Sequence, residues 1–262
     1  MWRLNGKLKN SRIFYAALDL FSSALFPEVC YFCGSSVTGE GSVICADCRN
    51  SIRIVSEPFC DLCGLPLSTF DDFASTICGR CLTKPPPYDK ARYGVYYEQS
   101  VRTGITRLKF HSSLFNVRPV GELLLQAFNT HYSSERFDSI IPVPVHRKRL
   151  ISRGFNQAIS VSKRLSESTG IFLDRTALVK SRDTAPQVGL PRSKRLVNLK
   201  NAFNISSPER ISGKRILIID DVSTTGATVS EAARAVRKVG AAYVAILVVA
   251  LRSKNRPAES DF

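Results

Sequence analysis

The distribution of hydrophobic residues along the carboxyl-terminal half of the chain is typical of a protein that alternates strands and helices. Two continuous apolar runs, Ile216–Ile219 and Tyr243–Leu251, predict strands that are buried on both faces. Between them, the chain has helical periodicity over Val229–Val239 and is closed by Gly240. Because a helix links two buried strands, this segment predicts an α/β fold with a parallel sheet flanked by helices.

Weaker periodicities upstream predict the remaining elements of the same domain. They are a strand over Ala91–Glu98, helices over Val101–Phe110, Pro119–Phe128 and Ala158–Ser168, a strand interrupted by prolines over Asp138–Val145, and a short strand near Thr176–Val179. The polar segment Arg182–Arg195 contains glycine and proline and predicts a mobile flap. The run Pro85-Pro86-Pro87 marks a linker, so we expect this domain to span residues 88–252 and residues 253–262 to form a tail.

Residues 1–26 predict an amphipathic helix. Its basic beginning is followed by the apolar run Ile13–Phe26, which is interrupted by Asp19. With 14 residues this run is too short to span a bilayer, and no small-x-small cleavage site follows it. Two interpretations stay open: the helix packs on its own protein, or it makes a weak contact with a membrane surface. We therefore expect a cytoplasmic protein, with a peripheral position at the inner face of the membrane as the alternative.

All eight cysteines fall into four Cys-x-x-Cys pairs near the amino terminus. The pairs are separated by 11, 11 and 14 residues and comprise Cys30, Cys33, Cys45, Cys48, Cys60, Cys63, Cys78 and Cys81. Two sulfurs three residues apart suit a metal knuckle better than a disulfide framework or a redox centre. In each half, glycine follows the first pair and isoleucine precedes the second, a duplication that favours two sequential four-cysteine sites over an interleaved pairing. Because four cysteines leave no open coordination position, the pattern predicts a zinc-ribbon-like lobe over residues 27–84 with two structural zinc ions.

Candidate ligand-binding residues follow the strand that ends at Ile219. Asp220 and Asp221 come first, and a turn rich in hydroxyl groups leads into the next helix. The turn comprises Ser223, Thr224, Thr225, Gly226, Ala227 and Thr228. Its backbone N–H groups, its hydroxyls and the helix N-terminus make an anion site of phosphate size, at the edge where open α/β sheets bind ligands. A solvated turn is the alternative, and a Walker-type loop is disfavoured because no Gly-Lys-Ser/Thr sequence follows.

The charge balance favours a polyanionic ligand or partner. The chain has 37 basic and 22 acidic residues, a net charge of +15. The stretch Arg147–Lys200 alone contains 13 basic and three acidic residues. It begins with a basic turn, Arg147-Lys148-Arg149, directly after the proline-interrupted strand, and a solvated charge run is the alternative interpretation of that turn.

The stretch Ile216–Val229 resembles the phosphoribosyl diphosphate (PRPP) signature of type I phosphoribosyltransferases, which is a hydrophobic strand, Asp-Asp, two residues and Thr-Thr-Gly-x-Thr. In that family the paired acids hold the ribose 2- and 3-hydroxyls, and the loop cradles the 5-phosphate. The resemblance implies these roles for Asp220, Asp221 and the Ser223–Thr228 turn. It also implies that Mg²⁺ bridges the pyrophosphate and the ribose hydroxyls of PRPP.

Nearly the whole chain is similar to the ComF family, competence-associated relatives of the phosphoribosyltransferases. Besides the cysteine pairs and the Asp-Asp signature, the shared motifs are Pro-Val-Pro-Val-His at 142–146, Arg-Gly-Phe-Asn-Gln at 153–157 and Arg-Asp-Thr-x-x-Gln-x-x-Leu at 182–190. Leu108-Lys109-Phe110 also matches, whereas His111-Ser112-Ser113 departs from the family's Arg-Gly-Asp-like continuation. The resemblance implies a type I phosphoribosyltransferase fold with an amino-terminal zinc finger. It also implies a role in handling imported single-stranded DNA during natural transformation.

Two functions follow as expectations. As a phosphoribosyltransferase, the protein would bind PRPP with Mg²⁺ through Asp220 and Asp221, and Arg147 and Arg182 would neutralise the departing pyrophosphate; positioning and electrostatics would do most of the work. The alternative is a non-catalytic module that keeps the phosphate pocket and handles single-stranded DNA. Its basic stretch, with Phe155 and Phe203 available for stacking, suits a single-strand backbone.

Overall fold

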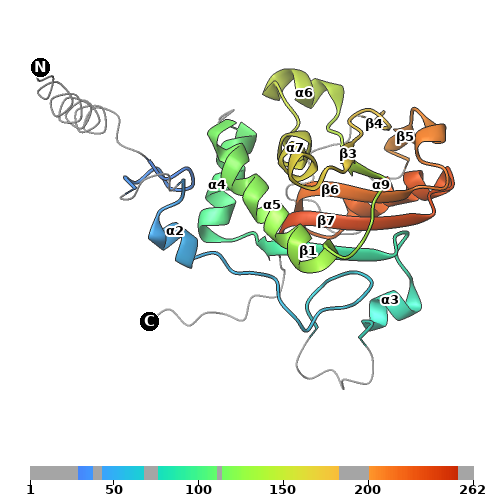
Figure 1. Ribbon diagram of the computed structural model, residues 1–262, viewed down its shortest axis with the longest axis horizontal. Coiled ribbons are helices and arrows are strands. Elements are labelled where there is room, and N and C mark those ends of the chain that lie inside the picture. The colour runs from blue at the N-terminus through green and yellow to red at the C-terminus, as the bar shows by residue number, and fades with distance from the viewer. Residues whose placement is uncertain (1–28, 38–42, 68–75, 111–113, 183–200, 253–262) are drawn as a thin grey trace, which may run out of the picture.

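The computed structural model describes residues 29–37, 43–67, 76–110, 114–182 and 201–252. A five-stranded sheet with the strand order β1-β7-β6-β2-β3 forms the centre of the molecule (Figure 1). All neighbouring strands in it are parallel. The strands are β1 (Lys90–Tyr96), β7 (Tyr243–Leu251), β6 (Arg215–Ser223), β2 (Ser139–Pro142) and β3 (Phe172–Leu173). The predicted parallel sheet with flanking helices is therefore confirmed.

Helices cover both faces of this sheet. One face carries α4 (Gln99–Phe110), α5 (Val117–Tyr132) and α7 (Gln157–Thr169), and the other carries α9 (Ala227–Lys238) (Figure 1). The shorter elements are the helices α2 (Ala46–Asn50), α3 (Gly79–Thr83) and α6 (Arg147–Arg153), the 3₁₀ turns η1 (Leu114–Asn116) and η2 (Pro208–Arg210), and the antiparallel pair β4 (Leu178–Lys180) and β5 (Phe203–Ile205).

The apolar run in β6 explains how the two layers are held together. Successive side chains of a strand point to opposite faces, so Ile216 and Ile218 pack with α9, whereas Leu217 and Ile219 pack with α5 and α7. All four side chains are fully buried. Burial on both faces is what a continuous apolar run predicts for a central parallel strand.

The amino-terminal lobe closes the outer edge of β1. The segment 53–55 runs antiparallel to β1, with a bridge between Ile54 and Val95. The Val55 amide donates to the Gly94 carbonyl at 3.0 Å, and the Tyr96 amide donates to the Arg53 carbonyl at 2.8 Å. Pairing of this kind protects a sheet edge from association with other chains.

One local prediction differs from the structure. The basic residues after Pro144 form the helix α6 instead of a turn, because His146 caps it by accepting from the Lys148 amide and Gly154 ends it in the left-handed conformation at φ +82°. No residue of α6 is buried, and its surface mixes basic side chains with the exposed Leu150 and Ile151. The predicted short strand near Thr176–Val179 is confirmed as β4, which pairs with β5 outside the parallel sheet.

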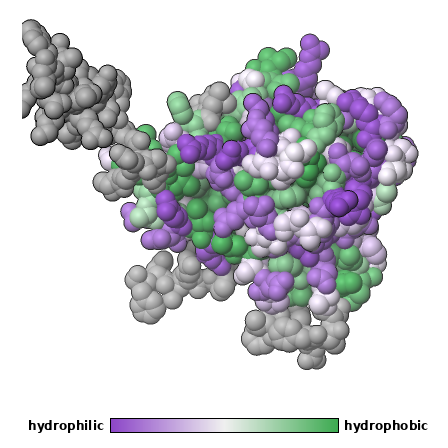
Figure 2. All heavy atoms as spheres, viewed as in Figure 1, coloured by the Kyte–Doolittle hydropathy of each residue, from purple (hydrophilic) through white to green (hydrophobic). Residues whose placement is uncertain are grey.

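Some expectations concern residues outside the described part of the chain. These are the amino-terminal helix over 1–26, the flap beyond Arg182 and the tail 253–262. Among the described residues, none of the helices is both long and apolar enough to cross a bilayer. Hydrophilic and hydrophobic side chains are interspersed over the face that carries α4, α5 and α6 (Figure 2).

Candidate functional site

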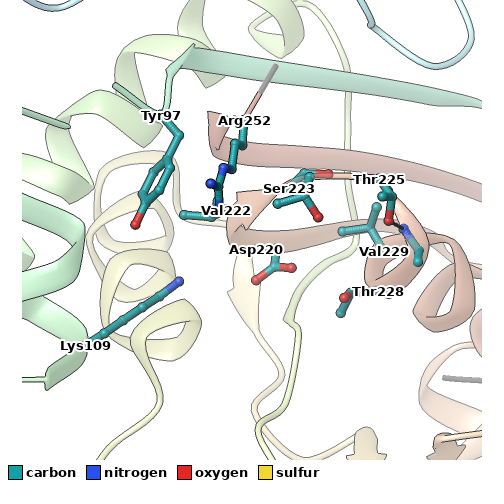
Figure 3. A pocket seen from close by; sticks show the side chains of 12 residues that line it. Tyr97, Lys109, Asp220, Val222, Ser223, Thr225, Thr228, Val229 and Arg252 are labelled. Atoms are coloured by element: carbon teal, nitrogen blue, oxygen red, sulfur yellow. Dashed lines mark hydrogen bonds between the residues drawn. The ribbon is translucent and has the colours of Figure 1, made fainter. Parts of the chain in front are cut away.

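A pocket of about 180 Å³ opens at the carboxyl end of β6 (Figure 3). It is lined by Tyr97, Lys109, Asp220, Val222, Ser223, Thr224, Thr225, Gly226, Ala227, Thr228, Val229 and Arg252. Residues from β6 and the turn after it form one wall, and the others arrive from the end of β1, from α4 and from the residue after β7. Open α/β sheets bind ligands at this edge.

The turn after β6 has the geometry of an anion site. Gly226 precedes α9 in the left-handed conformation at φ +74°, and the Ala227 amide donates to the Thr225 hydroxyl at 3.3 Å. A helix of 12 residues follows, with no acidic side chain in its first turn. Its amino-terminal N–H groups and its dipole therefore favour negative charge at the mouth of the pocket.

The two adjacent carboxylates occupy different positions. Asp220 lines the pocket, and its Oδ1 accepts from the Asp221 amide at 2.9 Å. Asp221 is 8% exposed, and its Oδ2 lies 2.6 Å from the Lys109 ammonium of α4. Burial, reinforced by the negative charge of Asp221, raises the pKa of Asp220 to about 8, and the positive charge of Lys109 acts in the opposite direction.

Basic groups approach Asp221 from two helices. Lys109 comes from the end of α4, and its side chain reaches into the pocket on the side opposite the turn (Figure 3). Arg153, at the end of α6, donates to the Gln157 side-chain carbonyl at 2.8 Å. Burial lowers the pKa of Arg153 while the charge of Asp221 raises it, so this guanidinium lies within electrostatic reach of Asp221. The positive charge near Asp221 thus comes from residues far apart in sequence.

The structure brings most of the predicted site residues together. Asp220 and the whole turn Ser223–Thr228 line one pocket, with Asp221 beside it. Arg147 is exposed at the first position of α6, and Arg182 is exposed at the last described position before the flap; neither lines the pocket. Sequence reasoning assigned no role to Lys109, Tyr97 or Arg252, and the only signal was the match of Leu108-Lys109-Phe110 to a family motif.

The cysteines form two sequential four-sulfur clusters. The first ribbon, residues 29–37 and 43–50, carries Cys30, Cys33, Cys45 and Cys48, and the second ribbon, residues 59–67 and 76–83, carries Cys60, Cys63, Cys78 and Cys81. Within each cluster all sulfurs lie within 4.8 Å of one another. This arrangement decides between the two pairings that the sequence left open, in favour of the sequential one.

The donor sets fit tetrahedral zinc. The Cys33 and Cys45 sulfurs are 3.7 Å apart, and those of Cys63 and Cys78 are 3.8 Å apart. Four ligands at a Zn–S distance of about 2.3 Å place their sulfurs roughly 3.8 Å from one another. Backbone amides point at the sulfurs after tight turns, as where Ser35 N–H lies 3.4 Å from the Cys33 sulfur. Hydrogen bonds from the Ser35 side chain and amide lower the pKa of Cys33 to about 6, whereas burial raises the pKa of Cys48 in the same cluster. A bound zinc ion would hold all four cysteines as thiolates. Both ribbons are therefore structural zinc sites.

Comparison with known proteins agrees with both parts of the structure. A model of the double zinc ribbon domain matches residues 21–82, and a model of the phosphoribosyl transferase domain matches residues 151–261. The chain is 33% identical over 223 residues to the DNA utilization protein YhgH of Escherichia coli O157:H7, covering 84% of this chain and 95% of that protein. It is also 31% identical over 215 residues to competence protein F of Haemophilus influenzae, covering 80% and 91% of the two chains. The chain belongs to the ComF family.

Part of this ComF protein aligns with solved phosphoribosyltransferase structures. One is the purine phosphoribosyltransferase of Pyrococcus horikoshii, which is 23% identical and aligns with 52% of this chain and 73% of that chain at a TM-score of 0.32.

Proposed function

We propose that this ComF protein binds a phosphoribosyl ligand of the PRPP type together with Mg²⁺. The proposal rests on one observation, the convergence of Asp220, the turn Ser223–Thr228 and the amino terminus of α9 on a single pocket. An anion-binding turn beside a carboxylate matches a ligand that has a phosphate at one end and hydroxyl groups next to it.

Each part of the pocket has a role in this proposal. The N–H groups of the turn and the hydroxyls of Thr225 and Thr228 hold the 5-phosphate. Asp220 accepts hydrogen bonds from the ribose hydroxyls, and Asp221 supports it from the Lys109 side. The cluster of carboxylates and phosphate oxygens suits Mg²⁺, which prefers oxygen ligands and would neutralise charge on the pyrophosphate.

Transfer of the phosphoribosyl group to an acceptor is the catalytic extension of this proposal. Breaking the bond between C1 and the pyrophosphate develops positive charge on the ribose and negative charge on the leaving group. The chain supplies positioning and electrostatic stabilisation through Lys109 and Arg153, which lie near the pocket. In this proposal Arg147 of α6 and Arg182 neutralise the departing pyrophosphate.

Titration calorimetry tests the binding step. Wild-type protein should bind PRPP with Mg²⁺, and the double variant Asp220→Asn/Asp221→Asn should lose most of that affinity because the hydroxyl and metal side of the site loses its charge. Inorganic phosphate without Mg²⁺ should bind the wild type and the variant alike, because it has no ribose hydroxyls and the turn that holds the 5-phosphate is intact in both. Equal binding of PRPP by the two proteins would contradict the proposal.

A second candidate function is the handling of single-stranded DNA in DNA uptake. Relatives are named as DNA utilization and competence proteins. The chain carries a net charge of +15, and α6 presents the exposed Arg147 and Lys148 at the same end of the sheet as the pocket. A basic helix beside a phosphate pocket could follow a nucleic-acid backbone.

Fluorescence anisotropy with a labelled oligonucleotide tests this function. The logarithm of the association constant should fall linearly with the logarithm of the salt concentration. The double variant Arg147→Ala/Lys148→Ala should reduce the magnitude of this slope by about 1.4, because each lost phosphate contact contributes about 0.7 on single strands. Lys214→Ala/Lys238→Ala removes two exposed charges, just before β6 and at the end of α9, that are remote from the pocket; it is the matched control and should leave the slope unchanged. A slope that is the same in the α6 variant and the wild type, or no affinity for the oligonucleotide, would contradict this function.

A further inference from the structure

The first ribbon packs against one face of helix α4 and makes hydrogen bonds with it. Phe32, between two of the zinc ligands, is fully buried, and a Cβ added to Gly104 would lie 2.2 Å from its ring. Arg107 donates to the Cys33 carbonyl at 3.0 Å, and the Ser100 hydroxyl donates to the Cys48 carbonyl at 2.9 Å. Residues 100, 104 and 107 have the spacing of a single helix face. The zinc-binding turns therefore fix both the position and the rotation of α4.

The same helix delivers Lys109 to the pocket. Lys109 lies two residues beyond Arg107, and its ammonium is 2.6 Å from the Asp221 carboxylate. Ile105 and Leu108 of α4 are fully buried in the core against α5, so the helix is held on a second side. Because an ion pair at this distance tolerates little displacement, the reach of Lys109 depends on how the helix is seated.

The second ribbon is attached to a different element. A Cβ on Gly64 would lie 2.2 Å from the Ala91 carbonyl oxygen of β1, and the Ala91 amide donates to the Leu62 carbonyl at 2.8 Å. Arg92 of β1 donates to the Asp61 carbonyl at 2.9 Å. In each ribbon a backbone carbonyl thus accepts a hydrogen bond from an arginine of the larger domain. For the first ribbon this arginine lies on α4, and for the second ribbon it lies on β1.

We propose that the first ribbon helps to shape the ligand pocket. Its contacts fix the position and rotation of α4, so that Lys109 can pair with Asp221 and hold this carboxylate in place. The effect on ligand affinity rests on the proposed PRPP function, whereas the seating of Lys109 does not. The two ribbons, although similar in sequence, therefore differ in role. The first ribbon positions helix α4 beside the pocket, and the second ribbon is hydrogen-bonded to the edge strand β1.

Two matched substitutions in the zinc-loaded full chain separate these roles. Arg107→Ala removes the contact with the Cys33 carbonyl and leaves all eight cysteines in place, which avoids the unfolding that a ligand substitution risks. Arg92→Ala removes the equivalent contact with Asp61, and it also removes a bond to the Ala91 carbonyl at 2.8 Å. The control, Arg92→Ala, therefore removes at least as many contacts as the test variant, Arg107→Ala. Elemental analysis should find an unchanged zinc content in both variants.

Nitrogen-15 NMR of the lysine ammonium groups reports on the ion pair between Lys109 and Asp221 in the absence of any ligand. The Lys109 signal is assigned by its loss in Lys109→Arg. In Arg107→Ala we expect this signal to shift and to exchange faster with water, and in Arg92→Ala we expect it to match the wild type. The ammonium of Lys90, paired with Glu135 at 2.8 Å, serves as the internal control for Arg107→Ala. An unchanged Lys109 signal in Arg107→Ala, or equal changes in both arginine variants, would overturn the proposal.

A double-mutant cycle measures the consequence for PRPP with Mg²⁺. Arg107→Ala should weaken binding about tenfold in the wild-type background, a coupling typical of residues in one network, and should cause no further loss when Lys109 is already methionine. Independent, additive losses would overturn the link from ribbon to pocket. If the wild type does not bind PRPP at all, the proposed function fails, and the NMR comparison alone decides whether the first ribbon seats Lys109.

Discussion

Three ionisable side chains, Asp220, Asp221 and Lys109, determine the electrostatics of the pocket. Two neighbouring carboxylates repel each other, and burial adds to the cost of ionising both. Lys109 pairs directly with Asp221, whereas burial and the neighbouring Asp221 raise the pKa of Asp220. A cationic ligand group or Mg²⁺ in the pocket would favour ionisation of Asp220 as well. The site is therefore arranged to gain negative charge when a cation enters.

The raised pKa of Asp220 predicts a pH-dependent stability. In the unfolded chain an aspartate has a pKa of about 3.9, and in the fold that of Asp220 is about 8, so the folded state holds the extra proton between these values. Stability contributed by this proton is present at low pH and is lost as the pH rises through 8. Asp220→Asn removes this dependence. Urea unfolding from pH 5 to 8.5 at constant zinc should show the wild type losing stability relative to the variant, and parallel curves would contradict the assignment.

Sequence alone identified the carboxylates and the turn because all of them lie on consecutive residues between one strand and one helix. Lys109 and Arg252 line the same pocket from positions far from Asp220 in the sequence. Their arrival depends on how α4 and β7 pack around β6. No local pattern encodes that packing, so the partner of Asp221 could be found only in the folded molecule.

At the scale of elements, the ribbons and the sheet are joined by close backbone contacts that require glycine. Gly64 has φ +64°, and the Ala91 carbonyl of β1 fills the place of a side chain. Gly104 plays the same part on α4, where the ring of Phe32 fills the space. Each ribbon is thus in direct contact with an element of the larger domain, the second through a backbone carbonyl and the first through a buried aromatic ring.

Gly64→Ala should therefore destabilise the protein strongly. A left-handed conformation costs an ordinary residue about 1–2 kcal/mol, and forced overpacking adds about 1–3 kcal/mol. We expect a loss of about 2–5 kcal/mol in the free energy of unfolding. Gly79→Ala is the matched control, because nothing lies within 4 Å of a Cβ at that position. Chemical denaturation of the two variants makes the comparison, and equal stabilities would contradict the close contact with β1.

Among the elements, long apolar runs were predicted well and the short polar helix was not. The runs that form β6 and β7 are buried on both faces, so their pattern reflects the core directly. Helix α6 has no buried residue and so no periodic apolar signal. Its cap is His146, which is not among the residues preferred at that position, and the two prolines before it suggested a turn.

At the scale of the whole molecule, the zinc ribbons extend the core of the phosphoribosyltransferase-like domain. Cys30 and Cys48 of the first ribbon belong to the same buried cluster as the helices α4, α5 and α7. Segment 53–55, between the ribbons, completes the edge of β1. The duplicated cysteine pattern predicted the metal sites, but it could not predict where the ribbons dock, because those contacts involve glycines and backbone carbonyls rather than a recognisable motif.

Loss of metal should consequently destabilise the whole chain. Elemental analysis should find two zinc ions per chain, and a strong chelator should lower the midpoint of thermal unfolding because both clusters lose their cross-links. A reductant such as dithiothreitol should leave the midpoint unchanged, which distinguishes zinc thiolates from disulfides. Sensitivity to reductant together with indifference to the chelator would contradict zinc binding.

A crystal structure of the zinc-loaded protein with PRPP and Mg²⁺ would show directly whether the turn after β6 holds the 5-phosphate of a phosphoribosyl ligand. We expect the 5-phosphate to lie against the N–H groups of Thr225–Thr228, the ribose hydroxyls toward Asp220, and the pyrophosphate on the side of Lys109. A ligand whose phosphate lies outside the turn, for example on α6 with the turn empty, would contradict the proposed function.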